Sequence, residues 1–154
     1  MTHLCCDVLK ALEGKTLATA ESCTGGMIGG MLTAVPGASK VYKGGIISYW
    51  SEVKQNLLDV DEEDLRNLGP VSMQVAGAMA AGSRKALKTD VAVSVTGLAG
   101  PDGDEFGRPV GTVFVGYCDG AKTVAKEYRF YGTREEVRRQ AAEAALRLIL
   151  ECMR

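Results

Sequence analysis

Residues 16–32 read TLATAESCTGGMIGGML, and this stretch decides the fold class. Its beginning, residues 16–20, is typical of an extended strand. Residues 21–26 break the strand, because two consecutive glycines permit a tight turn. A helical stripe of apolar side chains follows at Met27, Ile28, Met31, Leu32 and Val35. The stretch therefore predicts a strand, a glycine turn and a helix, which together form the first part of an α/β unit.

The same alternation continues along the chain. We expect further strands at 45–50, 91–95, 110–117 and 123–130, and helices over 4–13 and from residues 51, 72 and 133 onward. Asp119-Gly120 predicts a hairpin between the last two strands. Ser72 is a candidate helix cap, Thr133 and Glu136 have the spacing of a capping box, and the acidic residues 61–64 are expected to form a solvated turn.

Helices that alternate with strands, followed by a hairpin, predict a three-layer α/β/α sandwich with a mixed, mostly parallel sheet of about five strands. The 154 residues fit a single domain spanning residues 1–154. Hydrophobic residues make up 46% of the chain and charged residues 24%. These fractions are close to those of globular proteins, so we expect a packed core.

Composition also excludes several classes of function. The 18 Lys+Arg and 19 Asp+Glu nearly balance and form no basic run, which argues against nucleic acid as a partner. No apolar run approaches the roughly 20 residues of a membrane span, and the start of the chain does not resemble a signal peptide, so we expect a cytoplasmic protein. The single histidine and five scattered cysteines offer no metal site or disulfide framework.

Two glycine-rich loops, residues 21–26 and 96–103, each follow a predicted strand. Ligands of open α/β sheets bind at the carboxyl ends of strands, so these loops are candidate binding sites. Free N–H groups at the start of the helix after Gly26 favour an anion or a developing oxyanion. The alternative is that Thr24 simply caps this helix and the glycines permit close packing.

Ser22 is a candidate nucleophile in the first loop. The only histidine is His3, near the terminus, so a serine–histidine–aspartate triad is nearly excluded. Lys54 is the best placed substitute, with Tyr49 nearby, because partial burial lowers a lysine pKa from about 10.4 towards neutrality. The alternative is a solvated lysine beside a packing tyrosine.

Cys23 is a rival nucleophile, with Glu21 and Lys54 as its basic partners. Neighbouring side chains on an extended segment point in opposite directions, so Ser22 and Cys23 are not both expected to face the site. We therefore rank Ser22 first.

Four motifs occur together at residues 19–26, 48–51 with Lys54, 96–103 and 108–113. In combination they resemble the C-terminal domain of the CinA (competence/damage-inducible protein) family, over nearly the whole chain. The resemblance implies a nicotinamide-nucleotide amidohydrolase. Such an enzyme converts nicotinamide mononucleotide to nicotinate mononucleotide and ammonia in NAD salvage, without a metal or cofactor.

The resemblance also implies the roles of individual residues. Ser22 is the nucleophile, Lys54 its general base and Tyr49 the residue that orients or relays the proton. The nucleotide pocket is lined by Thr24, Gly25, Gly26, Thr96, Gly97, Ala99 and Gly100. A homodimer is implied by the family alone, and the cation for the substrate phosphate is left open among Lys43, Arg108, Arg134 and Arg138.

Two other functions stay open at this point. The glycine turns also suit a non-catalytic nucleotide-binding or interaction module related to competence and the DNA damage response. A hydrolase that uses Cys23, or that acts on a different amide, is the third hypothesis.

Overall fold

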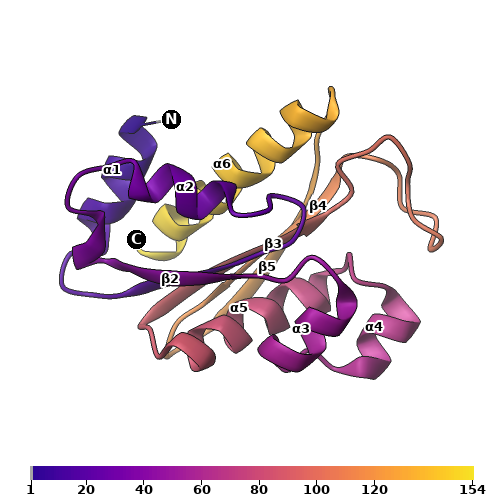
Figure 1. The fold of residues 1–154 in the computed structure, drawn as a ribbon, viewed down its shortest axis with the longest axis horizontal. Coiled ribbons are helices and arrows are strands. Elements are labelled where there is room, and N and C mark those ends of the chain that lie inside the picture. Colours follow the sequence, from indigo (N-terminus) through magenta and orange to yellow (C-terminus); the bar gives the residue numbers. More distant parts are fainter. Residues whose placement is uncertain (1) are drawn as a thin grey trace.

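The computed structural model describes residues 2–154. Figure 1 shows its elements in chain order. They are α1 (Thr2–Ala11), β1 (Leu17–Glu21), α2 (Met27–Thr33), the short 3-10 helix η1 (Ala38–Lys40), β2 (Tyr42–Ile47), α3 (Ser51–Leu58), α4 (Glu62–Leu68), α5 (Met73–Leu87), β3 (Val91–Gly97), β4 (Thr112–Cys118), β5 (Thr123–Arg129) and α6 (Arg134–Cys152).

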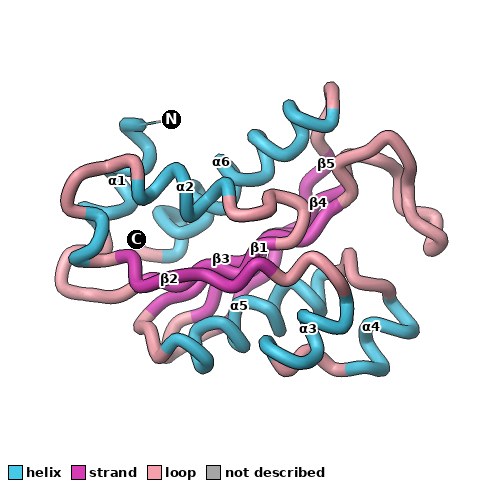
Figure 2. Tube along the Cα trace, viewed as in Figure 1, coloured by secondary structure: helices cyan, strands magenta, loops and turns pink. Residues whose placement is uncertain are grey.

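The strands form one mixed sheet in the order β2-β1-β3-β4-β5. β1 pairs in parallel with β2 and β3, while β4 pairs antiparallel with β3 and β5. Helices α1, α2 and α6 cover one face of the sheet, and α3, α4 and α5 lie on the other (Figures 1 and 2). The predicted α/β/α sandwich and the hairpin are confirmed. Two of the four strand pairings are parallel and two are antiparallel, because β4 runs opposite to β3 and β5 runs opposite to β4.

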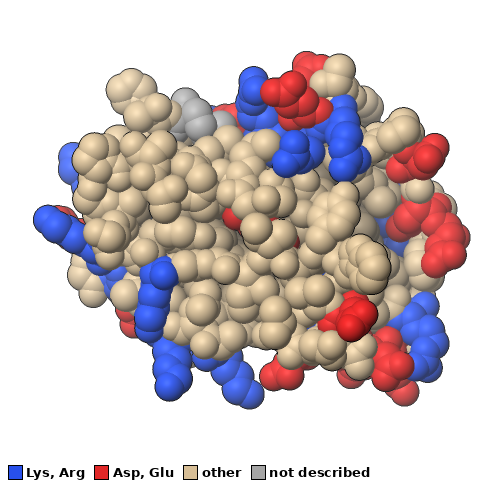
Figure 3. Space-filling view, viewed as in Figure 1, with Lys and Arg blue, Asp and Glu red and all other residues tan. Residues whose placement is uncertain are grey.

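The centre of the sheet is buried on both faces. Every residue of β1 is buried, as expected for a strand between two helical layers. Leu12, Ile28 and Leu146 pack in the core beneath α1, α2 and α6, and Leu58 and Met79 pack on the opposite side. Charged side chains on the face shown in Figure 3 gather at its rim and leave the middle largely uncharged.

Helix α5 packs closely against the sheet at Gly116 of β4. A Cβ added to Gly116 of β4 would collide with the carbonyl oxygen of Ala76 in α5 and with the hydroxyl of Ser94. Small residues on both elements therefore allow backbone to approach backbone.

Two local predictions were wrong. Residues 61–64 do not form a turn but begin α4, because the Asp61 side chain accepts a hydrogen bond from the Glu63 N–H and caps the helix. The second strand spans Tyr42–Ile47 instead of residues 45–50, so residues 48–50 form a loop and Trp50 precedes α3. The caps of α5 and α6 are confirmed, including the capping box of α6.

Within residues 2–154, no helix is both long enough and apolar enough to cross a membrane.

Candidate active site

A cavity of about 240 Å³ lies beyond the carboxyl ends of β1 and β3. The two strands run in parallel, so the loops that follow them meet at the same edge of the sheet. Among the residues predicted to be catalytic or to line the nucleotide pocket, those that line the cavity are Ser22, Tyr49, Lys54, Thr96, Gly97, Ala99 and Gly100. The structure thus brings segments from three distant parts of the chain to one cavity.

Ser22 is the first residue after β1, and its backbone is anchored on both sides. Its N–H donates to the Val95 carbonyl on β3 at 3.0 Å. The carbonyl of the preceding residue, Glu21, accepts from the Ser48 N–H beyond β2 at 2.8 Å. Ser22 is therefore held at the end of β1 by backbone hydrogen bonds to both neighbouring segments.

Lys54 reaches this serine from α3, which lies on the other face of the sheet from α2 (Figure 1). Its side-chain nitrogen, Nζ, lies 3.0 Å from Ser22 Oγ. The same nitrogen donates to the backbone carbonyls of Ser48 and Tyr49. Burial lowers the pKa of Lys54 from 10.5 to about 8. The lysine is thus a buried amine in contact with the serine hydroxyl, and not a solvated surface residue.

Tyr49 lies at the rim of the cavity. Its carbonyl holds Lys54, but its phenol points elsewhere: the Tyr49 hydroxyl accepts from Arg134 Nη2 at 3.2 Å, and 56% of the residue is exposed. Arg134 also donates to the Gly100 carbonyl at 2.6 Å. The three residues of the implied catalytic group thus border one cavity, but the phenol is hydrogen-bonded to Arg134 and not to Ser22 or Lys54.

Thr24, Gly25 and Gly26 are not brought to the cavity wall. Thr24 is buried and donates its hydroxyl to Glu21 at 2.7 Å. Gly25 and Gly26 have φ values of 58° and 104°, a left-handed conformation that favours glycine. The three residues thus shape the turn behind the cavity. Thr24 does not cap α2 either, because Gly26 occupies the N-cap position.

The start of α2 is occupied by a side chain of the protein itself. Glu21 is buried, and its carboxylate accepts from the N–H groups of Gly26, Ile28 and Gly29. These amides, predicted to bind an anion or oxyanion, already have an anionic partner. Sequence reasoning missed this role of Glu21, which lies five positions before the N-cap residue Gly26; a carboxylate near a helix N-terminus is the signal that points to it.

Cys23 borders the same cavity as Ser22. Its side chain is buried in the hydrophobic core, which agrees with the expectation that the Ser22 and Cys23 side chains do not both face the site. Burial raises the pKa of the Cys23 thiol to about 12. Glu21, one of its expected basic partners, is turned towards α2. A thiol with so high a pKa yields little thiolate, which disfavours Cys23 as the nucleophile.

Arg134 alone among the four candidate cations lines the cavity. Arg108 donates to the Leu68 carbonyl at 2.9 Å, and Lys43 donates to the Lys88 carbonyl at 3.3 Å. Arg138 donates to backbone carbonyls in the Ser22 turn. Across residues 2–154 there is no cluster of three or more His, Cys, Asp or Glu side chains that would hold a metal ion.

The fold and the site define a three-layer α/β/α domain with a buried serine–lysine pair at the carboxyl ends of parallel strands. The chain belongs to the CinA family, since the family model described as the CinA C-terminal domain matches residues 2–153.

Known proteins agree with this assignment. The chain is 47% identical over 135 residues to a CinA-like protein of Sulfurihydrogenibium sp. (88% of this chain, 34% of that protein), and 48% identical over 140 residues to one of Trichodesmium erythraeum (89% and 33%). It thus spans about a third of the length of these relatives.

Solved structures resemble it over nearly their whole length. A CinA superfamily protein from Klebsiella pneumoniae 700603 superimposes with a TM-score of 0.95 at 33% identity, covering 99% of this chain and 96% of that one. The competence/damage inducible protein CihA from Agrobacterium tumefaciens superimposes with a TM-score of 0.94 at 34% identity, covering 99% and 95%.

Proposed function

We propose that this domain hydrolyses the carboxamide of nicotinamide mononucleotide to nicotinate mononucleotide and ammonia. The observation that carries the proposal is the buried contact of 3.0 Å between Ser22 Oγ and Lys54 Nζ at the wall of a cavity. A serine becomes nucleophilic only when a base removes its proton, and a lysine with a lowered pKa is such a base.

The surroundings of Lys54 direct its lone pair. A neutral amine has two N–H donors and one lone pair, and the carbonyls of Ser48 and Tyr49 accept two hydrogen bonds from Nζ. The lone pair then faces the remaining neighbour, the Ser22 hydroxyl. With a pKa of about 8, about one tenth of the lysine is neutral at pH 7, which suffices for general base catalysis.

The chemical steps follow from this geometry. Lys54 takes the proton of Ser22 while Oγ attacks the carboxamide carbon. The C–N bond then breaks, and Lys54 returns the proton to the departing nitrogen, which leaves as ammonia. A water molecule, deprotonated by Lys54, then attacks the acyl-enzyme. Lys54 returns this proton to Ser22 Oγ as the ester bond breaks, and the released carboxylic acid loses its proton to solvent. No step requires a metal ion.

Backbone amides at the cavity are available for the oxyanion of the tetrahedral intermediate. Within the part of the chain that the structure describes, the amides of Cys23 and Ala99 donate to no other protein group, and both residues line the cavity. Cys23 directly follows the nucleophile, a common position for such a donor. One donor contributes about 3 kcal/mol to transition-state stabilisation.

Arg134 supports a nucleotide substrate. The cavity of about 240 Å³ is small for a complete nucleotide, since ligand pockets typically measure roughly 300–1,000 Å³. The nicotinamide ring would occupy it, and the phosphate would remain at the rim, where Arg134 supplies a positive charge. The Thr96, Gly97 and Ala99 loop would contact the ribose.

A second candidate is a nucleotide-binding module without catalysis. It is favoured by the position of the Tyr49 phenol, which is bonded to Arg134 rather than directed at Lys54.

The deciding experiment measures ammonia release from nicotinamide mononucleotide by the wild type and by Ser22→Ala, with EDTA present to remove stray metal. Turnover by the wild type alone supports the proposal. Nucleotide binding by both proteins without product supports the second candidate, and equal turnover by both removes Ser22 from the mechanism.

A further inference from the structure

The turn that carries Ser22 is held from its inner side by Glu21. Both oxygens of this buried carboxylate are used: Oε1 accepts from Thr24 Oγ1, Gly26 N and Ile28 N, and Oε2 accepts from Gly29 N. The four distances range from 2.7 to 3.2 Å. Glu21 therefore ties the end of β1 to the start of α2 across the turn.

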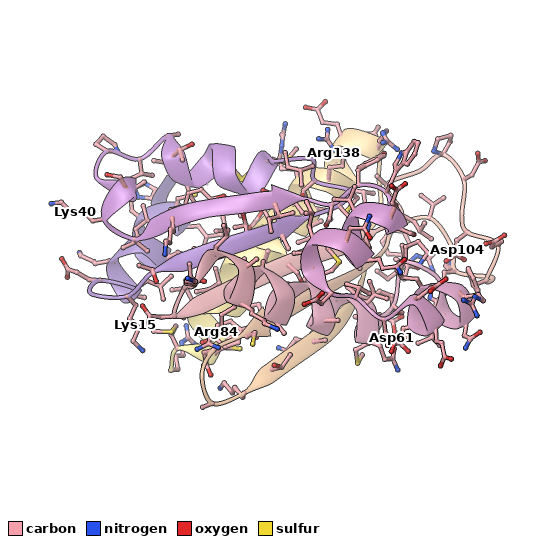
Figure 4. The ribbon with its side chains drawn as sticks, turned by 60° about the horizontal axis from the view of Figure 1, so that its bottom comes forward. Lys15, Lys40, Asp61, Arg84, Asp104 and Arg138 are labelled. Carbon is pink, nitrogen blue, oxygen red and sulfur yellow. The ribbon has the colours of Figure 1, made fainter. Side chains whose placement is uncertain are left out.

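The outer side of the same turn is held by Arg138 of α6, which is labelled in Figure 4. Its Nε donates to the Cys23 carbonyl at 2.9 Å, and its Nη2 donates to the Thr24 carbonyl at 3.2 Å. The guanidinium is half-buried and packs over Gly25, where an added Cβ would lie 3.6 Å from Nη2. The arginine thus bridges two successive peptides with one rigid group.

This contact fixes the direction of the peptides after Ser22. Successive carbonyls of an extended chain point to opposite sides, whereas those of Cys23 and Thr24 both point to Arg138. Within residues 2–154 the Cys23 carbonyl accepts from no other group. The preceding peptide is fixed separately, because Gly25 N–H donates to the Ser22 carbonyl at 3.1 Å.

We infer that Arg138 is a positioning residue for the nucleophile: together with Glu21, it clamps the Ser22 turn so that Oγ stays in contact with Lys54. The inference rests on the proposed role of Ser22. Arg138 does not line the cavity and acts through the backbone of the turn. The rival role is direct contact with the substrate phosphate, for which Arg138 was a candidate from the sequence.

The first test compares Arg138→Met with Arg139→Met. Arg139 is the matched control, because it is the next residue of α6 and makes only an exposed i,i+4 ion pair with Glu135 at 2.9 Å. Each variant is assayed with nicotinamide mononucleotide and with nicotinamide riboside, which lacks the phosphate. We expect kcat of Arg138→Met to fall about 100-fold on both substrates, with KM nearly unchanged, because small displacements of a nucleophile have effects of that size.

The two substrates separate the two roles of Arg138. A loss confined to the phosphate-bearing substrate and expressed in KM would overturn the inference in favour of phosphate binding. Arg138→Lys keeps the charge but loses the fork that spans two carbonyls, so it should recover only part of the loss. Added guanidinium should restore part of the activity of Arg138→Ala.

A second readout does not depend on the proposed substrate. A fluorophosphonate probe reacts with activated serines, and we expect it to label the wild type but not Ser22→Ala. Labelling of Arg138→Met should slow by a factor similar to that in kcat, while thermal unfolding followed by circular dichroism shows that the variant is folded. If Arg138→Met does not fold, the same labelling comparison is made with Arg138→Lys.

The outcomes of labelling are distinct from those of the amidase assay. Labelling of the wild type without nucleotide turnover would reject the proposed function and leave the inference standing. Labelling of the Arg138 variants at the wild-type rate would overturn the inference. A wild-type Ser22 that is not labelled would overturn it as well, since no activated serine would then need positioning.

Discussion

The side-chain nitrogen of Lys54 lies 3.0 Å from the hydroxyl of Ser22, although 32 positions separate the two residues in the chain. They come from opposite sides of the sheet, Ser22 from the turn before α2 and Lys54 from α3. The contact is buried, so both residues meet away from bulk water. The pH dependence of catalysis and of stability should both follow from this contact.

The pH dependence of catalysis should follow the titration of Lys54. The base must be neutral, and burial lowers the pKa of Lys54 to about 8. We therefore expect kcat/KM to rise with pH and to level off above a midpoint near pH 8. A pH–rate profile in matched ionic strength tests this, and a midpoint near that of an ordinary lysine, 10.5, would contradict it.

The stability of the fold should depend on pH through the same group. Because the folded-state pKa of about 8 is below the ordinary value of 10.5, the unfolded chain binds more protons between these values. The free energy of unfolding contributed by this group therefore rises with pH from about 8 to 10.5. Denaturant titrations of the wild type and Lys54→Met measure the difference, which should grow in favour of the wild type over this interval. A constant difference would mean that Lys54 has an unshifted pKa.

The rim contact between Tyr49 and Arg134 should behave as a coupled pair. The tyrosine phenol bonds to the guanidinium, while its carbonyl, which a side-chain substitution does not remove, holds Lys54. We expect Tyr49→Phe to retain more activity than Lys54→Met and to be non-additive with Arg134→Met. A double-mutant cycle on kcat/KM should give a coupling of about 1 kcal/mol or less. Complete inactivation by Tyr49→Phe would instead give the phenol a direct part in proton transfer.

Cys23 should be dispensable for the reaction. Its thiol pKa is raised to about 12 by burial, so it supplies almost no thiolate near neutral pH. We expect Cys23→Ala to retain kcat within a few-fold, whereas Ser22→Ala loses turnover. Parallel assays of the two variants provide the check, and the opposite pattern would move the nucleophile to Cys23.

Glu21→Gln should destabilise the protein. A glutamine puts an NH2 group where a carboxylate oxygen now accepts from backbone N–H groups, which cannot accept a hydrogen bond in return. We expect a loss of about 1–3 kcal/mol in the free energy of unfolding, the usual effect of an unsatisfied buried polar group. Urea unfolding measures it, with Glu13→Gln, an exposed residue in the turn after α1, as the control. A stability within error of the wild type would show that the carboxylate is not needed as an acceptor.

Much of this arrangement was predictable from the sequence. The strand, turn and helix of residues 16–32 depend on local preferences, and the pairing of Ser22 with Lys54 follows from the rule that parallel strands end at one edge. Helix α4 escaped prediction because it has no buried residue, so no apolar periodicity marks it.

The direction of two side chains was beyond local reasoning. Glu21 turns to α2, and the Tyr49 phenol turns to Arg134, because each is set by contacts that form only in the folded chain. The true end of the second strand at Ile47 has the same origin, since residues 48–50 leave the sheet to approach Lys54.

Because the residues of the site come from both helical layers, the site forms only when the protein has folded. Lys54 belongs to α3 on one face of the sheet, while Arg138 belongs to α6 on the other, and Ser22 lies between them. In a folding intermediate whose helices have formed but do not yet pack on the sheet, Ser22 would lack its contact with Lys54 and would be unreactive. The chemical reactivity of Ser22 therefore reports a late step of refolding. It should appear only after both helical layers have packed on the sheet, later than the recovery of the helical circular dichroism signal.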